Sequence, residues 1–360
     1  MSSLNVAQDE AQPLPPASLT LRDAFSDFAA VASRLVHDGS VDAANSPRLT
    51  IGIPTFRRLS LLVEAVRSAA AQCCDGGFEI VIVDNDPDSR DCEAMFAAAP
   101  DLRSAPIRYF VNAANIGMFG NWNRCVELAR GEWVTVLNDD DLLHAKFAER
   151  MLTLLGEAPE AWDGLICRKQ TFDERPGADE GSMHSGLRAR VAHVVRSLLF
   201  AGRKTRRIGA RQLFWGNLLG NCVGFVCRTA QMREIGGFYP ENYPSADYYF
   251  YTRFAGHLRL GQTREILASI RVAENESARP EVLYGFLKTG YQLQQALAGT
   301  QLPRWWRRIS PWLIARHVGE LSEGWNVPLD RQVVERSLGI ALPADHKRGM
   351  MMLRAALRGF

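Results

Sequence analysis

Residues 78–86 read Phe-Glu-Ile-Val-Ile-Val-Asp-Asn-Asp, an almost uninterrupted apolar run that ends in three polar residues. This run is rich in β-branched residues and predicts a strand buried on both faces, which is typical of parallel sheets. Ligands of such sheets bind beyond the carboxyl ends of the strands. Asp84 and Asp86 therefore mark an expected binding edge.

Further strands and helices alternate on both sides of this run. Short β-rich segments are Leu49–Ile53, Ile107–Phe110 and Glu132–Leu137, and segments with helical spacing are Leu59–Cys73, Asp91–Ala99 and Phe119–Arg130. The connections are long enough for right-handed crossovers. The sequence therefore predicts an α/β protein with a doubly wound sheet flanked by helices, beginning at Arg48.

Segments of different character flank this predicted domain. Residues 1–17 indicate a flexible tail, and apolar residues at helical spacing predict an amphipathic helix over Ser18–Val36. From about Pro280 the pattern is helical and basic. We expect three regions: 1–47 (tail plus helix), 48–279 (the α/β domain, with halves 48–142 and 143–279) and 280–360 (a basic helical appendage).

Composition and charge exclude several classes of protein. The 360 residues carry a net charge of only +2, which indicates neither a nucleic-acid partner nor an acidic one. No window approaches the ~18 consecutive apolar residues of a transmembrane helix, and the N-terminus lacks the pattern of a secretory signal. Seven scattered cysteines without a C-x-x-C motif predict reduced thiols and a cytoplasmic protein.

Several catalytic motifs are missing. The sequence has no Walker A motif, no G-x-G-x-x-G after a strand, no H-E-x-x-H and no G-x-S-x-G. ATPase, dinucleotide oxidoreductase, zincin and serine-hydrolase functions are therefore disfavoured.

The fourth predicted strand ends in a second acidic cluster, Asn138-Asp139-Asp140-Asp141. Two like charges about 4 Å apart repel by ~1 kcal/mol in water and ~4 kcal/mol at an effective dielectric of 20. Oxygen ligands of this kind suit Mg²⁺ or Mn²⁺, which keep positions open for phosphate oxygens. The alternative is that these aspartates only cap a helix near Ala145.

Taken together, four motifs resemble family 2 of the glycosyltransferases. They are Ile53-Pro54-Thr55-Phe56-Arg57-Arg58, Val83-Asp84-Asn85, Asn115-Ile116-Gly117, and Gly131-Glu132-Trp133 leading into Leu137–Asp141. The resemblance covers roughly Arg48 to Val272. It implies an inverting enzyme with a GT-A-like, doubly wound mixed sheet and a nucleotide-sugar donor.

The resemblance implies a division of roles among the residues at the strand ends. Phe56 would stack on the base, with a place in the core as the alternative, and Asp84 would accept a hydrogen bond from base or ribose. Asp140 would be the direct ligand of Mn²⁺ or Mg²⁺, supported by Asp141, although the family usually has Asp where this chain has Asn138. The implied nucleotide-binding residues are Pro54, Thr55, Phe56, Arg57, Asp84, Asn115, Gly117 and Asp139.

The expected catalytic base comes from the acceptor half. Gly236-Gly237-Phe238 followed by Asp247 resembles the family's "GGF … ED" segment, with Ala246 in place of the first acid. An inverting displacement needs one carboxylate to accept the acceptor's proton; the alternative for Asp247 is a helix N-cap. Ala273 stands where many members have His, so Arg271, Trp215 and Asn221 are further candidates for contacts with phosphate or acceptor.

These residues predict a metal-dependent inverting glycosyltransferase. Its donor would be a UDP, dTDP, GDP or CDP sugar, and its acceptor a saccharide or lipid-linked saccharide in bacterial surface polysaccharide (O-antigen-like) assembly. Residues 301–360 hold ten basic against five acidic residues. Three of their tryptophans, Trp305, Trp306 and Trp312, suit either a peripheral contact at the inner face of the cell membrane or the core of the appendage.

Three rival functions remain. A non-catalytic nucleotide-sugar-binding protein is favoured by Ala246 and Ala273. Nucleotidylyl transfer would need a Gly-rich loop after the first strand, which the sequence lacks. Nucleic-acid binding through Arg188–Arg211 is disfavoured because no motif of stacking aromatic residues accompanies the charge.

Overall fold

The computed structural model describes residues 19–39, 46–157, 162–173, 204–272 and 279–344. The predicted tail and most of the basic segment 188–211 lie outside these residues. The chain forms two compact units, which we call the sheet unit (Thr20–Gly209 and Leu218–Glu274) and the helical unit (Met1–Leu19, Ala210–Asn217 and Asn275–Phe360). The sheet unit thus begins before the expected boundary at residue 48, and a short segment around residue 213 groups with the C-terminal helices.

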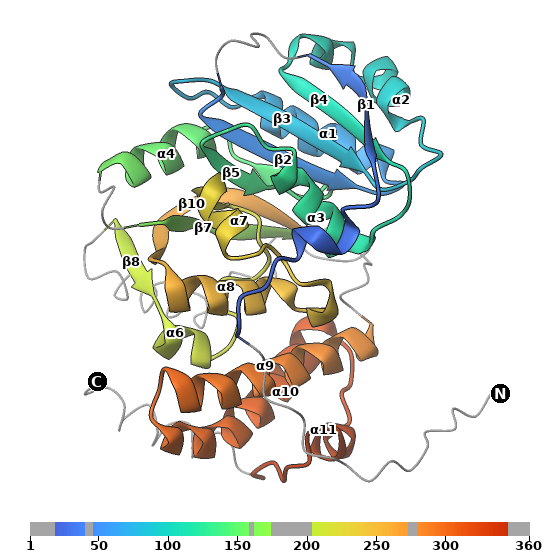
Figure 1. Ribbon diagram of the computed structural model, residues 1–360. Coiled ribbons are helices and arrows are strands. Elements are labelled where there is room, and N and C mark those ends of the chain that lie inside the picture. The colour runs from blue at the N-terminus through green and yellow to red at the C-terminus, as the bar shows by residue number, and fades with distance from the viewer. Residues whose placement is uncertain (1–18, 40–45, 158–161, 174–203, 273–278, 345–360) are drawn as a thin grey trace, which may run out of the picture. The chain divides into compact units, whose positions relative to one another are not determined.

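A ten-stranded mixed sheet forms the centre of the sheet unit, in the order β1-β4-β3-β2-β5-β9-β7-β10-β6, with β8 also paired to β10 (Figure 1). Its parallel half confirms the four predicted strands: β2 (Leu49–Thr55), β3 (Phe78–Asp84), β4 (Ile107–Asn112) and β5 (Trp133–Val136).

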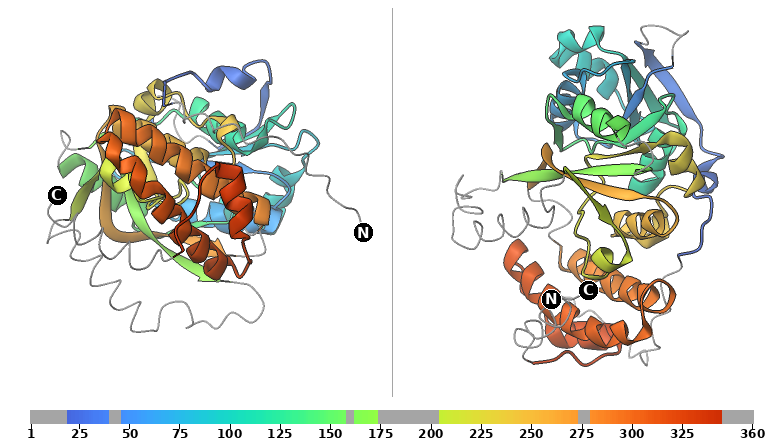
Figure 2. Two further views of the ribbon diagram at one scale, coloured as in Figure 1. Left: turned by 90° about the horizontal axis from the view of Figure 1, so that it is seen from below. Right: turned by 90° about the vertical axis from the view of Figure 1, so that its left-hand side faces the viewer.

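The second half of the sheet mixes strand directions. β9 (Phe225–Arg228) is antiparallel to both β5 and β7 (Gly164–Asp173), and β7 is parallel to β10 (Leu260–Val272). Strands β7 and β10 lie side by side in both views of Figure 2. Two short strands, β6 (Leu142–Leu143) and β8 (Thr205–Ile208), pair antiparallel with β10.

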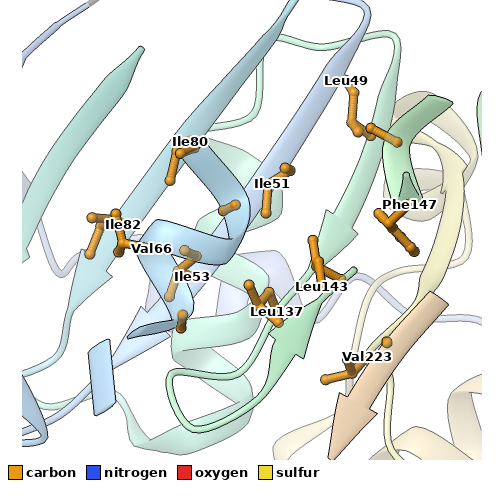
Figure 3. Close-up of a cluster of buried hydrophobic side chains, with 14 of the residues drawn as sticks. Leu49, Ile51, Ile53, Val66, Ile80, Ile82, Leu137, Leu143, Phe147 and Val223 are labelled. Carbon is orange, nitrogen blue, oxygen red and sulfur yellow. The ribbon is translucent and has the colours of Figure 1, made fainter. Parts of the chain in front are cut away.

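Helices cover the parallel strands on both faces, which explains their nearly continuous apolar sequences. On one face Ile51, Ile53 and Ile80 pack against Val66 and Phe147 in the main core (Figure 3). The helices that contribute to this core are α1 (Leu59–Ala70), α2 (Asp91–Ala98) and α4 (Phe147–Glu157).

On the other face α3 (Gly117–Glu127) packs on the sheet through Cys125, which contacts Val81, Val83 and Phe110. Gly52 lies beneath this helix, and a Cβ atom at Gly52 would come within 2.6 Å of the Cys125 Cβ. Glycine is therefore required here for the close approach of α3 to β2.

The remaining elements of the sheet unit are short, apart from α8. They are η2 (Pro100–Ser104), α7 (Thr229–Glu234), η3 (Pro240–Asn242) and α8 (Ala246–His257).

The predicted N-terminal helix over Ser18–Val36 is wrong. Phe25–Phe28 forms only a 3₁₀ turn, η1, and Ser33–Asp38 forms β1, which pairs antiparallel with β4. The Arg124 guanidinium donates to the carbonyls of Phe28 (2.9 Å) and Val31 (2.7 Å). In a helix these carbonyls would accept hydrogen bonds from the helix's own N–H groups. Here they bond to α3 instead, and β1 pairs with β4, so tertiary contacts override the helical spacing of the apolar residues.

The helical unit confirms the helical character predicted after Pro280. Its elements are α6 (Ala210–Phe214), α9 (Pro280–Thr300), η5 (Arg304–Ile309), α10 (Ser310–Trp325) and α11 (Arg331–Leu338). Its core joins Leu287 of α9 to Ile314 of α10 and Val334 of α11.

Two tryptophans of the appendage differ in their exposure. Trp306 is buried and packs edge-on against Phe214 and Trp215, whereas the neighbouring Trp305 is 50% exposed. Trp306 is therefore a core aromatic, and Trp305 is a surface one.

All seven cysteines have free thiols, four of them buried. Among the described residues, no helix combines the length and the apolar character needed to span a bilayer.

Candidate active site

The predicted site residues of the donor half lie at one edge of the sheet. β2 ends at Thr55 and β3 at Asp84, and the chain leaves β5 into a loop that carries three aspartates. Because these strands are parallel, their carboxyl ends share an edge. We call residues 138–141 the acidic loop.

Asp84 lies at this edge but is fully buried. Its carboxylate accepts hydrogen bonds from the Tyr109 hydroxyl (2.8 Å), the Ser89 hydroxyl and the Asp86 backbone N–H (3.0 Å). The structure therefore shows Asp84 holding the turn after β3, and its predicted contact with base or ribose stays a prediction.

Asn85, which was not predicted to have a role in the site, ties the Asn115-Ile116-Gly117 segment to β3. Its amide nitrogen donates to Asn115 Oδ1 (2.8 Å), and its amide oxygen accepts from the Ile116 N–H (3.0 Å). Asn115 and Gly117 are themselves exposed at this edge. Asn85 and Asn115 are 30 positions apart, so their hydrogen bond becomes visible only in the folded structure.

Phe56 and Arg57 project from the turn after β2. The Phe56 ring is 40% exposed, which contradicts the alternative of a core position, and the Arg57 guanidinium lies 5.0 Å from its centroid. Arg57 also donates to Asp86 (2.5 Å) and holds the pKa of that carboxyl below its usual range. An exposed ring, a guanidinium and a carboxylate together suit recognition of a nucleoside.

Asp139, the first aspartate of the acidic loop, faces β2. It is buried, and its Oδ2 accepts a hydrogen bond from the Thr55 hydroxyl (2.8 Å). Burial raises the pKa of Asp139 to about 6, and the neighbouring charge of Asp140 adds to the rise. The folded surroundings of Asp139 therefore oppose its charged form.

Asp140 points away from the core. Its side chain is 22% exposed, and its Oδ2 lies 3.0 Å from the Arg58 guanidinium, which also approaches Asp139 at 3.5 Å. Arg58 was not predicted as a site residue, yet it supplies a positive counter-charge to both aspartates.

Asp141 is turned into the protein. Its carboxylate accepts from the Arg271 backbone N–H (3.0 Å), the Asn138 amide (3.0 Å) and the Asn221 amide (3.1 Å). Burial, with the charge of Asp140 second, raises the pKa of Asp141 to about 7. The structure thus shows Asp141 as an anchor of the acidic loop.

Arg271 supports the same loop. Its Nε donates to the Asp140 backbone carbonyl (3.0 Å), and its Nη2 donates to Glu64 of α1 (2.5 Å). The side chain is only 5% exposed, so Arg271 and Asn221 hold the loop by contacts that sequence alone did not predict. Trp215, the third candidate, belongs to the helical unit, where its ring packs against Phe214 and Trp306.

The candidate base Asp247 lies in the first turn of α8. Ser245 occupies the N-cap position, so the capping alternative for Asp247 is wrong. Its carboxylate is half-buried and accepts a hydrogen bond from the N–H of Tyr248 (2.7 Å). It lies near enough to Lys169 to act on that lysine electrostatically.

The capping alternative for the acidic loop also fails, because α4 begins only at Phe147. Within the described part of the chain, no three His, Cys, Asp or Glu side chains converge as a ready-made metal site. The buried amide oxygen of Asn138, however, has no hydrogen-bond partner among the described residues. Mg²⁺ is usually held by one or two carboxylates plus substrate phosphates. An orphaned hard oxygen in the same loop as the half-buried Asp140 carboxylate fits such a cation.

The chain is similar to known proteins in sequence and in fold. Residues 50–221 match the family model described as Glycosyl transferase family 2. This segment belongs to that family. The resemblance inferred from the four motifs is thereby confirmed.

The first curated relatives that the chain matches are named as glycosyltransferases. The chain is 34% identical over 117 residues to the GalNAc(5)-diNAcBac-PP-undecaprenol beta-1,3-glucosyltransferase of Campylobacter jejuni, an alignment that covers 32% of this chain and 36% of the relative. The chain spans 34 to 43% of the length of the first curated relatives that it matches.

Two solved structures confirm the GT-A fold of the family 2 domain. TarS 1–349 of S. aureus in complex with UDP-GlcNAc aligns with TM-score 0.54 at 14% identity, covering 81% of this chain and 79% of that one. The mannosyltransferase PcManGT of Pyrobaculum calidifontis, in complex with GDP-Man and Mn²⁺, aligns with TM-score 0.51 at 16% identity, covering 93% and 86%.

Proposed function

We propose that this protein is an inverting glycosyltransferase that moves a sugar from a nucleotide diphosphate to an acceptor hydroxyl. One observation carries the proposal. In a family 2 domain, the acidic loop stands at the carboxyl edge of the parallel strands beside the exposed Phe56–Arg57 turn. An edge that combines an aromatic face with carboxylates has the chemistry needed to hold both ends of a nucleotide-sugar donor.

In this proposal the donor's nucleoside lies against the ends of β2 and β3. Phe56 stacks on the base, with Arg57 and Asp86 beside it, and Thr55 orients Asp139 toward the ribose. Pro54, Asp84, Asn115 and Gly117 shape this part of the edge. A UDP, dTDP, GDP or CDP sugar would fit this chemistry, and the two structural neighbours described above bind UDP-GlcNAc and GDP-Man.

Asp140, with the amide oxygen of Asn138, is the proposed holder of Mn²⁺ or Mg²⁺. A bound divalent cation would supply charge neutralisation to the departing diphosphate. Asp141, expected as a second ligand, instead fixes the loop that presents Asp140. One structural neighbour contains Mn²⁺, which supports this choice of ions.

Asp247 is the proposed base. Its carboxylate takes the proton of the acceptor hydroxyl while that oxygen forms a bond to the anomeric carbon. The bond from the anomeric carbon to the diphosphate oxygen breaks, and its electron pair leaves with the nucleotide. A single carboxylate is enough because no covalent sugar–enzyme intermediate forms.

The proposed acceptor is a saccharide or lipid-linked saccharide of bacterial surface polysaccharide. The named Campylobacter jejuni relative acts on an undecaprenyl-linked saccharide, which supports this class. A peripheral contact with the inner face of the cell membrane would suit such an acceptor. η5 provides a surface for this contact, since Trp305, Arg304, Arg307 and Arg308 are all exposed.

The proposal predicts that Asp140→Asn and Asp247→Asn lose activity for different reasons. Calorimetric titration with UDP, dTDP, GDP and CDP, with and without Mn²⁺, identifies the nucleotide; transfer and donor hydrolysis are then measured. Asp140→Asn should abolish the effect of Mn²⁺ on binding, whereas Asp247→Asn should bind the donor normally and lose at least 100-fold in transfer.

Asp75→Asn is the matched control, because Asp75 is an exposed aspartate in the turn before β3. It should behave as wild type. Full activity of both test variants would refute the proposal. Nucleotide binding without any turnover would instead favour the non-catalytic binding protein.

A further inference from the structure

Asn221 connects the acidic loop to the acceptor half of the sheet. Its amide nitrogen donates to Asp141 Oδ2 (3.1 Å), and its amide oxygen accepts from the Lys169 ammonium (3.2 Å). Its backbone carbonyl accepts from the same ammonium and from the Tyr251 hydroxyl (3.1 Å). The asparagine is therefore oriented from both sides, and its amide cannot rotate without losing both side-chain bonds.

Lys169 is an unusual residue for its place in the fold. It lies on β7, an interior strand between β9 and β10, and burial lowers the pKa of its ammonium. No described carboxylate lies within ion-pair distance of it. The carboxylates of Asp247 and Asp141 attract it from farther away and partly offset the effect of burial.

A purely structural site of this kind favours an apolar side chain, because taking an ammonium out of water costs several kcal/mol unless it gains good partners. Met or Leu of similar volume would fill this half-buried position at lower cost. A lysine at this position therefore indicates that its charge and its hydrogen bonds to Asn221 serve the neighbouring groups.

We propose that Lys169 is a positioning residue for the glycosyl transfer proposed above: through Asn221 it fixes the Asp141 anchor of the acidic loop, and through the Asn221 backbone carbonyl, which it shares with Tyr251, it is connected to α8, the helix of Asp247. The inference rests on that proposed function. Lys169 would thus connect the donor side, carried by the loop after β5, with the base, carried by α8. Groups from these two elements must keep their relative position for transfer, since a displacement of about 1 Å can cost 100-fold in rate.

The test uses Lys169→Met and Asn221→Leu in the full chain, separately and together. Each single variant should lower kcat about 10- to 100-fold. The donor KM should stay within about threefold of wild type, since Phe56 and the Thr55–Asp139 bond are untouched. Because both residues act through one connection, the double variant should be no worse than the worse single variant.

A pH profile separates the two parts of the role. The groups that act electrostatically on Lys169 are Cys167 on its own strand, Cys222, Asp141 and Asp247. Loss of the lysine's positive charge should raise the pKa of Asp247, so Lys169→Met should move the acidic limb of kcat/KM to higher pH. Asn221→Leu keeps the charge and should leave this limb in place.

Lys146→Met, at an exposed lysine before α4, is the matched control and should keep wild-type kinetics. Circular dichroism and melting temperature report folding; if Lys169→Met does not fold, Lys169→Gln and Asn221→Ser carry the same comparison. Unchanged kcat and an unmoved acidic limb in a folded lysine variant would overturn the inference. A wild-type protein that turns over no donor would overturn the proposed function itself, and this inference with it.

Discussion

At the scale of single residues, the three aspartates of the acidic loop show how neighbours in sequence acquire different roles. Asp139 faces Thr55, Asp140 faces solvent and Arg58, and Asp141 is surrounded by amide donors. The side-chain directions follow from the backbone path after β5, which brings each carboxylate to a different partner. Their chemical difference is therefore a property of surroundings and not of residue type.

Glu79 is a second residue whose contribution, here to stability, depends on its surroundings. It is buried in β3, and its carboxylate accepts from the Arg108 guanidinium (2.8 Å), the Thr50 hydroxyl (2.6 Å) and the Arg130 N–H (2.7 Å). This polar network joins β2, β3 and β4 behind the candidate site.

We predict that Glu79→Ala lowers the free energy of unfolding by about 3–5 kcal/mol, because it leaves the Arg108 charge buried without a carboxylate to pair with. The double variant Glu79→Leu/Arg108→Met should recover most of this loss, since no charge then remains buried. Urea denaturation of the three proteins measures both effects. Equal destabilisation by the single and double variants would contradict the explanation.

At the scale of elements, β1 is the strand least expected from the sequence, and His37 makes it sensitive to pH. The His37 ring packs against Phe96 of α2, with 4.5 Å between centroids, and its Nε2 is buried without a hydrogen-bond partner among the described residues. Burial lowers the pKa of His37; nearby Arg103 lowers it further, whereas Asp38 opposes the shift. The folded strand therefore favours the neutral ring.

We predict that β1 loosens as the pH falls below about 6.5, where His37 of the unfolded chain gains a proton that the folded strand resists. The contribution of neutral His37 to the stability of β1 is complete above this pH, and it is lost as the pH falls toward the lower pKa of His37 in the folded state. Amide hydrogen exchange of β1, corrected for intrinsic rates, should be faster at pH 5.5 than at pH 7.5.

The variant His37→Gln should remove this pH dependence. His257→Gln, at an exposed histidine in the last turn of α8, is the control and should retain it. A dependence that persists in His37→Gln would assign the effect to another group.

At the scale of the whole molecule, the helical unit carries an exposed basic and aromatic surface on η5, whereas the proposed donor-binding residues all belong to the sheet unit. In the 3₁₀ turn η5, three residues per turn bring Trp306 and Ile309 to the core and leave Trp305 with three arginines outside. Arg304, Arg307 and Arg308 form no ion pair with any residue that the structure describes. Tryptophan and arginine of this kind suit the polar–apolar boundary of an anionic bilayer.

We predict that the protein binds vesicles of anionic phospholipid and not zwitterionic ones, and that salt weakens this binding. Each arginine near such a surface contributes about 1 kcal/mol to the free energy of membrane binding. Replacing all three by Gln should therefore reduce partitioning about 100-fold in vesicle sedimentation. Arg336→Gln, an exposed arginine of α11, is the control; partitioning unaffected by the triple variant would exclude η5 as the contact.

The amino-acid sequence by itself determined the parallel half of the sheet and the location of the candidate site. Apolar runs such as Phe78–Val83 indicate strands buried on both faces, and polar residues directly after them must lie at one edge because parallel strands share direction. Both inferences depend only on short-range pattern and on the geometry of crossovers. The four motifs were sufficient to indicate the family.

Contacts between residues far apart in the chain decided the rest. β1 forms a strand because α3 and β4 offer partners that its own helical spacing cannot reveal. Arg58, Asn85 and Lys169 gain their importance from partners 30 to 82 positions away. Periodicity reports which face of an element is buried, but the environment of a carboxylate depends on which side chains the fold brings to it, and that is fixed only when the sheet has formed.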